Sequence, residues 1–269
     1  MPRFRNRIYL WAGRSSRSGA ALSHALGIQR IKPLNSCWHP NLGDLIINWG
    51  STNIPIRHLE NLQVACRYIN MPCKVSIAVD KVLSFALMKE EGVCIPAFTT
   101  SIDQAISWID DEGSTVVART LSRSSGGRGI KIITEENWRN GVDIPTAPLY
   151  TKYIKKNAEY RVHISQNKIF YVQKKLRRLE TPNENVNWQV RNHGNGFVFG
   201  IVQTSDLPRD VEFKAYQAMD ALRLDFGAVD IVETASKKAY VLELNTAPAL
   251  KGRSIEIYAR KFMEDYFAI

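Results

Sequence analysis

The sequence has few cysteines and no long apolar run, and each absence excludes a class of protein. Its four cysteines, Cys37, Cys66, Cys73 and Cys94, form no C-x-x-C pair, and no histidine cluster has zinc-ligand spacing. We therefore expect free thiols in a reducing compartment. No stretch approaches the ~18 apolar residues of a membrane span, and Arg14 interrupts the apolar stretch near the amino terminus before it is long enough for a signal-peptide core. These absences predict a cytoplasmic protein without a membrane segment.

The composition is that of a folded enzyme-sized protein. Of the 269 residues, 45% are apolar and 23% charged, which excludes a disordered chain. The length predicts about two structural units. The net charge of +10 favours an acidic partner, and a nucleoside triphosphate, an acidic peptide or a nucleic acid would each satisfy it. No nucleic-acid-binding motif accompanies the basic residues, so a solvated basic surface is the plain alternative.

The first third of the sequence alternates strand and helix patterns, which indicates a small α/β layer. The expected strands are residues 8–11, 45–49 and 75–78, and the expected helices are residues 19–26 and 59–68. Asp80 is placed to cap a helix over residues 81–91 that ends at Gly92. Ser101 and Gln104 have the spacing of a capping box for a helix that reaches Asp110.

The remaining two thirds are richer in strand patterns. We expect a hairpin of residues 115–119 and 129–133, strands at 149–154, 159–164 and 168–176, a long polar segment at 181–196, a helix at 208–222, then a hairpin and a last helix at 254–266. Long polar segments of this kind are usually functional or mobile.

A glycine-rich segment lies between the two strands of the first hairpin. Small residues there let backbone N–H groups approach an anion closely, and they are Ser124, Ser125, Gly126, Gly127 and Gly129. Arg119 precedes the segment and adds a positive charge suited to phosphate oxygens. The Gly-Lys-[Ser/Thr] ending of a Walker A loop is absent. A flexible hairpin loop is the alternative interpretation.

The closing hairpin carries candidate metal ligands. Side chains alternate along a strand, so Glu243 and Asn245 share one face, while Tyr240, Leu242 and Leu244 are expected in the core. Asp230 joins the first two if the paired residue numbers of the hairpin have an odd sum, and a one-residue slip would hide it. Magnesium takes one or two carboxylates and completes its shell with phosphate oxygens and water. A solvated hairpin with polar exposed positions is the alternative.

Basic residues follow the preceding strands. Glu159, Arg161 and His163 alternate onto one face, and Lys175, Arg177 and Arg191 come after them. Arginines aimed into a cleft could bind a carboxylate or neutralise a phosphoryl group in transfer. A surface ladder of ion pairs is the equally ordinary alternative, and neither His163 nor His193 has a recognisable nucleophile partner.

The order of these motifs, from about Val79 to Lys251, resembles the ATP-grasp superfamily, in particular the RimK-like amino-acid ligases. The matching segments are Asp80-Lys81 before residues 92–96, the glycine loop at 124–130, Glu159-Tyr160-Arg161, residues 190–194, residues 228–231 and residues 243–252. The last two, which resemble the family's "G-V-D-I" and "E-x-N-x-x-P-G-L-x-G" segments, are the most specific. Arg119-Thr120 departs from the family's usual Lys-Pro, and Lys152, Tyr153 and Ile154 lie where the family has an acidic adenine-side segment.

The resemblance implies an α/β (α+β) ATP-grasp fold. It predicts an amino-terminal α/β domain at residues 1–79, a central subdomain with the glycine loop at 80–148 and a carboxyl-terminal subdomain with the metal site at 149–269. The implied site uses ATP and Mg²⁺, with Mn²⁺ as the alternative metal. Asp230, Glu243 and Asn245 would bind the metal.

The same resemblance implies roles for the basic residues. Lys81 and Arg119 would hold phosphates with the glycine loop and Lys175, and residues 152–154 would contact adenine. Arg191 would stabilise phosphoryl transfer, and Arg161 would bind substrate or phosphate.

The implied activity is a carboxylate-amine ligase that forms an acyl phosphate and joins it to an amino acid or peptide amine. Attachment of an amino acid to a modified nucleotide or nucleic acid is the alternative within enzymes. A non-catalytic ATP-binding regulator is the other class, and retention of all three metal ligands argues against it. A basic nucleic-acid-binding protein is a third possibility. The sequence does not specify the oligomeric state.

Overall fold

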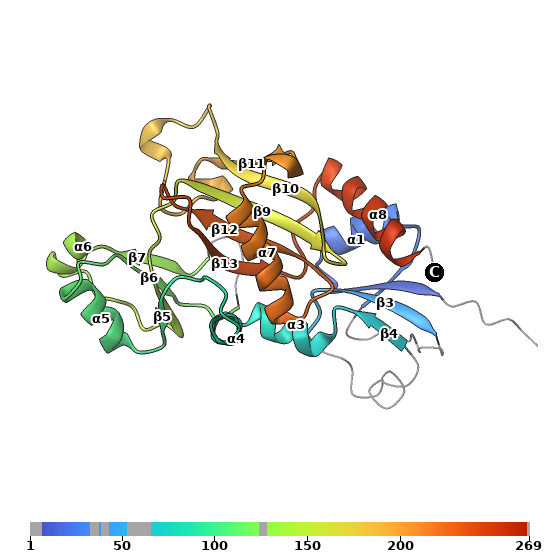
Figure 1. The fold of residues 1–269 in the computed structure, drawn as a ribbon, viewed down its shortest axis with the longest axis horizontal. Coiled ribbons are helices and arrows are strands. Elements are labelled where there is room, and N and C mark those ends of the chain that lie inside the picture. Colours follow the sequence, from blue (N-terminus) through green and yellow to red (C-terminus); the bar gives the residue numbers. More distant parts are fainter. Residues whose placement is uncertain (1–6, 33–37, 39–42, 53–65, 124–127, 268–269) are drawn as a thin grey trace, which may run out of the picture.

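The described strands of the protein form three sheets that follow one another along the chain (Figure 1). The computed structural model describes residues 7–32, 38, 43–52, 66–123 and 128–267. In that part of the chain, no helix is long and apolar enough to cross a bilayer.

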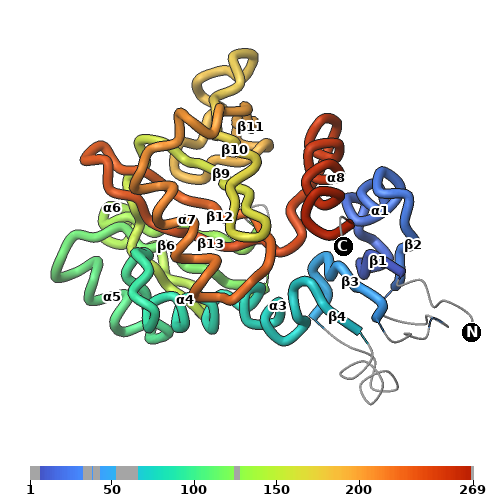
Figure 2. The backbone as a smooth tube through the Cα atoms, turned by 45° about the vertical axis from the view of Figure 1, so that its right-hand side comes forward, coloured from blue at the N-terminus to red at the C-terminus, as the bar shows by residue number. Residues whose placement is uncertain are grey.

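The first sheet is parallel and belongs to the amino-terminal part of the chain. Its strands, in the order β2-β1-β3-β4, are β2 (Gln29–Ile31), β1 (Ile8–Ala12), β3 (Asp44–Trp49) and β4 (Cys66–Ile69). Helices α1 (Arg17–Ala25) and α8 (Arg253–Tyr266) contribute to the apolar cluster on this sheet. Figure 2 shows α8, from the end of the chain, lying beside α1 from its beginning. The chain therefore closes on its amino-terminal unit.

Two expectations for this unit are wrong. Residues 75–78 belong to helix α3 (Pro72–Val79), which begins with a proline at its first turn and buries Val75 and Ala78 three residues apart. Four apolar residues are too few to distinguish a period of 2 from one of 3.6. Of the helix expected at 59–68, residues 59–65 lie outside the described residues, and the rest is in strand β4, whose backbone pairs with β3.

Helix α4 (Lys81–Glu90) follows directly, and its start is the one predicted. Asp80 caps it, because its Oδ1 accepts hydrogen bonds from the backbone N–H groups of Val82 (3.1 Å) and Leu83 (3.2 Å). The cap fixes Lys81 as the first residue of the helix, and its side chain is buried there.

The second sheet is antiparallel, with the order β5-β8-β6-β7. Its strands are β5 (Phe98–Thr99), β6 (Val116–Arg119), β7 (Ile130–Ile133) and β8 (Leu149–Lys152), and its helices are α5 (Ile102–Asp110) and α6 (Glu135–Arg139). The predicted hairpin is confirmed as β6 and β7, paired from Val116↔Ile133 to Arg119↔Ile130. Ser101 caps α5 as expected, because its Oγ accepts from the N–H of Gln104 at 3.3 Å. The expected capping box is not complete, because the Ser101 N–H donates to Thr99 Oγ1 at 3.0 Å.

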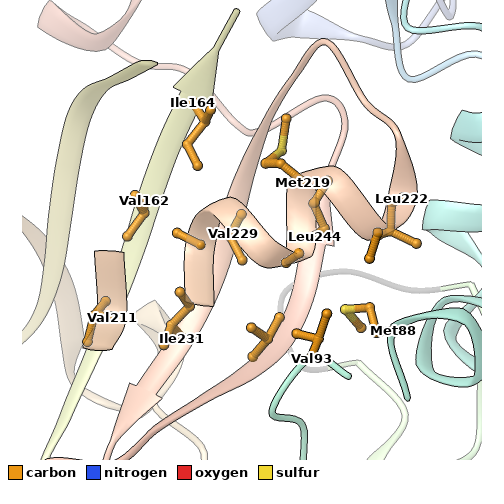
Figure 3. Close-up of a cluster of buried hydrophobic side chains, with 14 of the residues drawn as sticks. Met88, Val93, Val162, Ile164, Val211, Met219, Leu222, Val229, Ile231 and Leu244 are labelled. Carbon is orange, nitrogen blue, oxygen red and sulfur yellow. The ribbon is translucent and has the colours of Figure 1, made fainter. Parts of the chain in front are cut away.

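The third sheet is antiparallel, with the order β11-β10-β9-β12-β13. Its strands are β9 (Ala158–Ser165), β10 (Lys168–Arg177), β11 (Phe197–Val202), β12 (Phe226–Glu233) and β13 (Ala239–Asn245). Helix α7 (Arg209–Leu222) covers one face with its predicted stripe, in which Val211, Ala215, Ala218 and Leu222 are all buried. Figure 3 shows this core, where α7 meets β9, β12, β13 and residues of α4. The opposite face of the third sheet is not covered by α7.

The long polar segment before β11 contains two short 3-10 turns, η1 (Asn183–Asn185) and η2 (His193–Asn195), and a third turn, η3 (Thr204–Asp206), follows β11. Strands β2, β5 and β11 and helix α6 were not predicted. β8 pairs with β6 and so lies in the second sheet, and α8 packs at the first sheet. Both elements lie within residues 149–269.

Candidate active site

Four polar side chains meet where β9, β12 and β13 lie side by side. Asp230 pairs directly with Glu243 across the β12–β13 hairpin, and with Arg161 across β9–β12. The Arg161 guanidinium donates to both oxygens of Asp230, with Nε at 2.6 Å and Nη2 at 2.7 Å. Asn245 Nδ2 lies 3.2 Å from an oxygen of Asp230 and 3.2 Å from one of Glu243. The three predicted metal ligands and Arg161 are therefore one cluster.

The two carboxyl groups of this cluster differ in their electrostatic surroundings. Burial raises the pKa of Asp230, but the bidentate Arg161 guanidinium outweighs burial and holds this pKa below its ordinary value. Burial and the neighbouring Asp230 charge raise the pKa of Glu243. A cation placed between the two carboxylates would relieve their repulsion.

The hairpin register places Asp230 as the odd-sum condition requires, but one consequence drawn from simple alternation is wrong. The register shifts between Asp230 and Ile231, so that Ile231 pairs with Val241 and Leu242 is the extra residue of a bulge. Val241 is therefore in the core in place of Tyr240, and Leu242 lines the cavity described below. Leu244 is buried as expected.

Arg119 and Lys81 flank Glu243 with positive charge. Both are buried, at 7% and 8% exposure, and burial lowers the pKa of each cation, while the Glu243 carboxylate opposes that effect. The guanidinium carbon of Arg119 lies 5.7 Å from the centre of the Phe85 ring of α4. Arg119 Nε is buried and has no hydrogen-bond partner among the described residues. An anionic oxygen would satisfy that donor.

A cavity of about 670 Å³ lies between the second and third sheets and reaches the start of α1. Ten of the predicted site residues line it, and they are Arg119, Lys152, Tyr153, Ile154, Arg161, Lys175, Arg191, Asp230, Glu243 and Asn245. Its lining includes seven lysines and arginines against three acidic residues. This surplus of positive charge suits a polyanion such as a triphosphate. Lys81 lines a smaller neighbouring cavity of about 320 Å³, which shares Glu243 and Asn245 with the first.

Part of the lining of the larger cavity is apolar. These side chains come from β6, β7, β13 and the chain after β8, and they include Val117, Ile130, Ile132, Ile154 and Leu242. Lys152, which also lines the cavity, forms an ion pair with Glu112, and its Nζ lies 5.2 Å from the centre of the Trp108 ring. A cavity with both apolar and cationic side chains suits a nucleotide, which has an aromatic base and an anionic phosphate chain.

A second polar network crosses the cavity wall. Glu159, at 3% exposure, forms ion pairs with Lys175 and with Lys156, whose Nζ is 3.2 Å from its Oε2. Arg191 Nη2 donates to the carbonyl oxygen of Lys156 at 3.0 Å, and its Nε donates to that of Trp188 at 3.3 Å. Arg191 thereby connects the long polar segment to the chain that leads into β9.

Two predicted features do not join the site. His163 is buried behind it, with Nδ1 2.6 Å from the Tyr258 hydroxyl of α8 and Nε2 3.1 Å from Gln173 Oε1. Burial and the Arg161 charge lower the pKa of His163 to about 3, so the ring is neutral. Gly129 has the positive φ of 72° that glycine tolerates, but it is not among the cavity-lining residues. His193 does line the cavity.

Of the glycine-rich loop, Ser124, Ser125, Gly126 and Gly127 lie outside the described residues. Cavity residues that sequence reasoning missed include Arg17 at the start of α1, Lys156 and Phe199. Lys156 lies in a basic pair before a predicted strand, which is a weak signal. Arg17 and Phe199 reach the cavity through packing between elements, which leaves no local pattern.

The cluster has the donor set that a magnesium–nucleotide site needs. Among the described residues, no group of three or more His, Cys, Asp or Glu side chains could hold a metal ion. Two carboxylates and an amide suit Mg²⁺, because this ion completes its shell with phosphate oxygens and water. Rotation of the Asn245 amide by 180° would turn its oxygen toward the two carboxylates.

Comparison of sequences identifies a curated relative of this chain. No protein-family model matches the chain. A probable alpha-L-glutamate ligase of Mannheimia succiniciproducens is 25% identical over 201 residues, which are 73% of this chain and 64% of the relative. The chain thus spans less than two thirds of the length of that relative.

Comparison of structures gives matches along nearly the whole chain. The ATP-grasp ligase PsnB, complexed with a minimal precursor, has a TM-score of 0.67 at 10% identity and covers 96% of this chain and 99% of its own. D-alanine–D-alanine ligase from Bacillus anthracis has a TM-score of 0.65 at 17% identity, with 98% and 94% covered. A RiPP-associated ATP-grasp ligase of Chryseobacterium gregarium, in complex with ADP and a leader and core peptide, has a TM-score of 0.64 at 14% identity, with 97% of each chain covered. The resemblance inferred from the sequence is confirmed, and the chain has the ATP-grasp fold.

Proposed function

We propose that this protein is an ATP-dependent carboxylate-amine ligase that activates a carboxylate as an acyl phosphate and joins it to the amine of an amino acid or peptide. The observation that carries the proposal is the cluster of Asp230, Glu243 and Asn245 in a cavity lined by seven cationic side chains. The glutamate ligase relative and the peptide-bound ATP-grasp ligases support this class of substrate.

The site residues would have different roles according to their positions in the cavity. Asp230, Glu243 and Asn245 would hold Mg²⁺, which supplies positive charge to phosphate oxygens when bound. Arg119 and Lys81 would hold the phosphates from the other side, since the buried Arg119 Nε has no partner among the described residues. The apolar side chains of the cavity, Ile154 among them, would hold adenine.

A carboxylate is a poor acyl donor, because oxide is a poor leaving group, so the reaction first transfers a phosphoryl group to the carboxylate oxygen. Arg191 would balance the charge that is shared between that oxygen and the phosphoryl group. Arg161 would keep Asp230 ionised and oriented. The amine then attacks the acyl carbon and phosphate leaves, which forms the amide. Exclusion of water by the two sheets would protect the acyl phosphate from hydrolysis.

The division into domains follows the same scheme. We propose an amino-terminal unit at residues 1–79, joined in space by α8, and two clasping units that meet at the cavity. Assignment of β8 to the central unit is supported by its pairing with β5 and β6.

The test is ADP release from ATP and Mg²⁺ with pooled amino acids and acidic peptides, with mass spectrometry of the products. We expect ADP together with a product lighter than its summed parts by one water. The Glu243→Gln variant should fold and release no ADP, because it removes one carboxylate of the cluster. Activity equal to the parent in that variant would contradict the metal assignment. ATP binding without ADP release in every pool would favour a regulator.

A further inference from the structure

Strand β11 is an unusual edge for a sheet. It is the outermost strand of the third sheet, and the long polar segment that precedes it extends past it in both views (Figures 1 and 2). Phe197–Val202 contains five apolar residues and a glycine, and Val198 and Ile201 are 37% and 53% exposed. Edge strands are normally protected by charged residues, proline or bulges, because their free backbone groups can otherwise pair with another chain. This edge has neither charge nor proline.

The hydrogen-bond alternation shows which backbone groups of β11 face outward. Arg178 N–H donates to the Gly196 carbonyl at 2.8 Å, so this pair belongs to the hydrogen-bonded set of the β10–β11 ladder. Val198, two residues further on, belongs to the same set. Phe199 and Ile201 therefore point their N–H and C=O groups away from β10. No described residue accepts a backbone hydrogen bond from either N–H group.

The beginning of the edge is closed by the chain itself. Phe197 N–H, which points outward like those two, donates to the carbonyl of Asn192 at 3.0 Å in the long polar segment. The open part of the edge thus starts after Phe197 and offers two N–H and two C=O groups. A segment of about four extended residues would match it.

One side chain of the open edge borders the candidate active site. The Phe199 side chain lines the large cavity, and the Arg161 guanidinium carbon lies 4.6 Å from the centre of its ring. A strand added to β11 would lie next to this residue, at the edge of the third sheet opposite β12 and β13.

The charge beside the edge selects the chemistry of a partner. The adjacent strand β10 carries Lys174, which pairs with Gly200, and Arg177. Arg177 is exposed, and it pairs with Phe197, next to the open edge. An acidic segment is therefore favoured over a neutral or basic one.

We propose that the edge of β11 binds an extended acidic peptide by strand addition. The main-chain hydrogen bonds of Phe199 and Ile201 provide affinity without regard to side chains, and the basic residues of β10 provide the preference for acidic sequences. This binding does not rest on the proposed ligase function.

The experiment measures binding of fluorescein-labelled tetraglutamate to the full chain without ATP, by fluorescence anisotropy. Ile201→Pro removes one outward N–H and leaves the ladder to β10 intact, because position 201 does not donate to β10. Ile201→Ala removes the exposed side chain but keeps the N–H, and is the matched control. We expect Ile201→Pro to weaken binding about tenfold, which corresponds to about 1.4 kcal/mol, and Ile201→Ala to change it less than about threefold. Equal affinities of the two variants, or no binding by the parent protein, would overturn the proposal.

Hydrogen exchange on the parent protein gives a test that does not depend on the folding of a variant. Addition of tetraglutamate should slow exchange at the amides of Phe199 and Ile201, and leave those of Val198 and Gly200 unchanged because they already face β10. Unchanged exchange at Phe199 and Ile201 at a saturating peptide concentration would overturn the proposal. Sedimentation that shows a dimer whose formation protects these amides, with no effect of the peptide, would assign the edge to a second copy of the chain instead.

ADP release separates this inference from the proposed function. Binding of tetraglutamate with no ADP release from any substrate pool would support strand addition and contradict the ligase activity. ADP release with free glutamate and no peptide binding would support the ligase and overturn strand addition.

Discussion

His163 is buried behind the candidate active site, and its ionisation provides a quantitative test of the hydrogen bonds that hold its ring there. In the neutral ring, Nε2–H donates to Gln173 Oε1 at 3.1 Å, and Nδ1 accepts from the Tyr258 hydroxyl at 2.6 Å. A second proton on Nδ1 would remove that acceptor and add a charge in a buried position near Arg161. This explains the direction of the shift that lowers the pKa of His163 to about 3.

The pKa difference becomes a stability difference through linkage. In the unfolded chain His163 titrates near its ordinary pKa of about 6.5, so below that pH the unfolded state binds more protons than the folded state. Stability therefore falls as pH decreases from about 6.5 toward 3. Between pH 8 and pH 5 the loss that His163 contributes is about 2 kcal/mol, because about 1.5 pH units lie below the unfolded pKa at about 1.36 kcal/mol each.

The assay is urea denaturation of the parent and His163→Gln at pH 8 and pH 5. Glutamine can donate to Gln173 and accept from Tyr258 but does not titrate. We expect the parent to lose about 2 kcal/mol more than the variant between the two pH values, whatever the stability of the variant at pH 8. Equal losses in the two proteins would refute the assignment of His163 as a neutral, buried support.

Three further predictions follow from buried charges and caps. Arg161→Met leaves Asp230 without its bidentate partner, so we expect the free energy of unfolding, measured by urea denaturation, to fall by about 3–5 kcal/mol. A second substitution, Asp230→Asn, should recover part of this loss. Losses that are independent and additive would contradict the pairing. Arg119→Met should raise the dissociation constant for ATP at least about tenfold in calorimetric titration, because its buried Nε, which has no partner among the described residues, is the proposed donor to a phosphate oxygen; unchanged affinity would remove Arg119 from the phosphate site. Asp80→Ala should cost about 1 kcal/mol in thermal unfolding by removing the cap of α4, whereas Asp80→Asn should cost less; equal stability of all three proteins would contradict the cap.

The cluster of Asp230, Glu243 and Asn245 could be predicted from the sequence because strand alternation is a local rule. Glu243 and Asn245 are two residues apart, and Asp230 is conspicuous in an apolar run, so only the register remained to be determined. The bulge at Leu242 could not be predicted, because it depends on how two strands pair. The capped start of α4 at Asp80 was equally local and equally predictable.

Other features depended on tertiary packing. The strand expected at residues 75–78 is part of helix α3, because four apolar residues do not define a period, and the burial of Val75 and Ala78 is set by the packing of the surrounding elements. Strand β11 could not be predicted from its sequence, because a run of six residues that is apolar except for Gly200 shows no alternation, and pairing with β10 fixes it as a strand. Arg17 reaches the cavity only because α1 begins beside it, a fact about the arrangement of the first unit.

The most direct test of the central claim is ADP release from ATP and Mg²⁺ in the presence of glutamate and acidic peptides, with the parent protein and Glu243→Gln side by side. The proposed ligase predicts ADP and a condensed product, lighter by one water than its summed substrates, with the parent protein and neither with the variant. ADP release at equal rates by the two proteins, or a folded parent protein that binds ATP and releases no ADP with any acceptor, would contradict it.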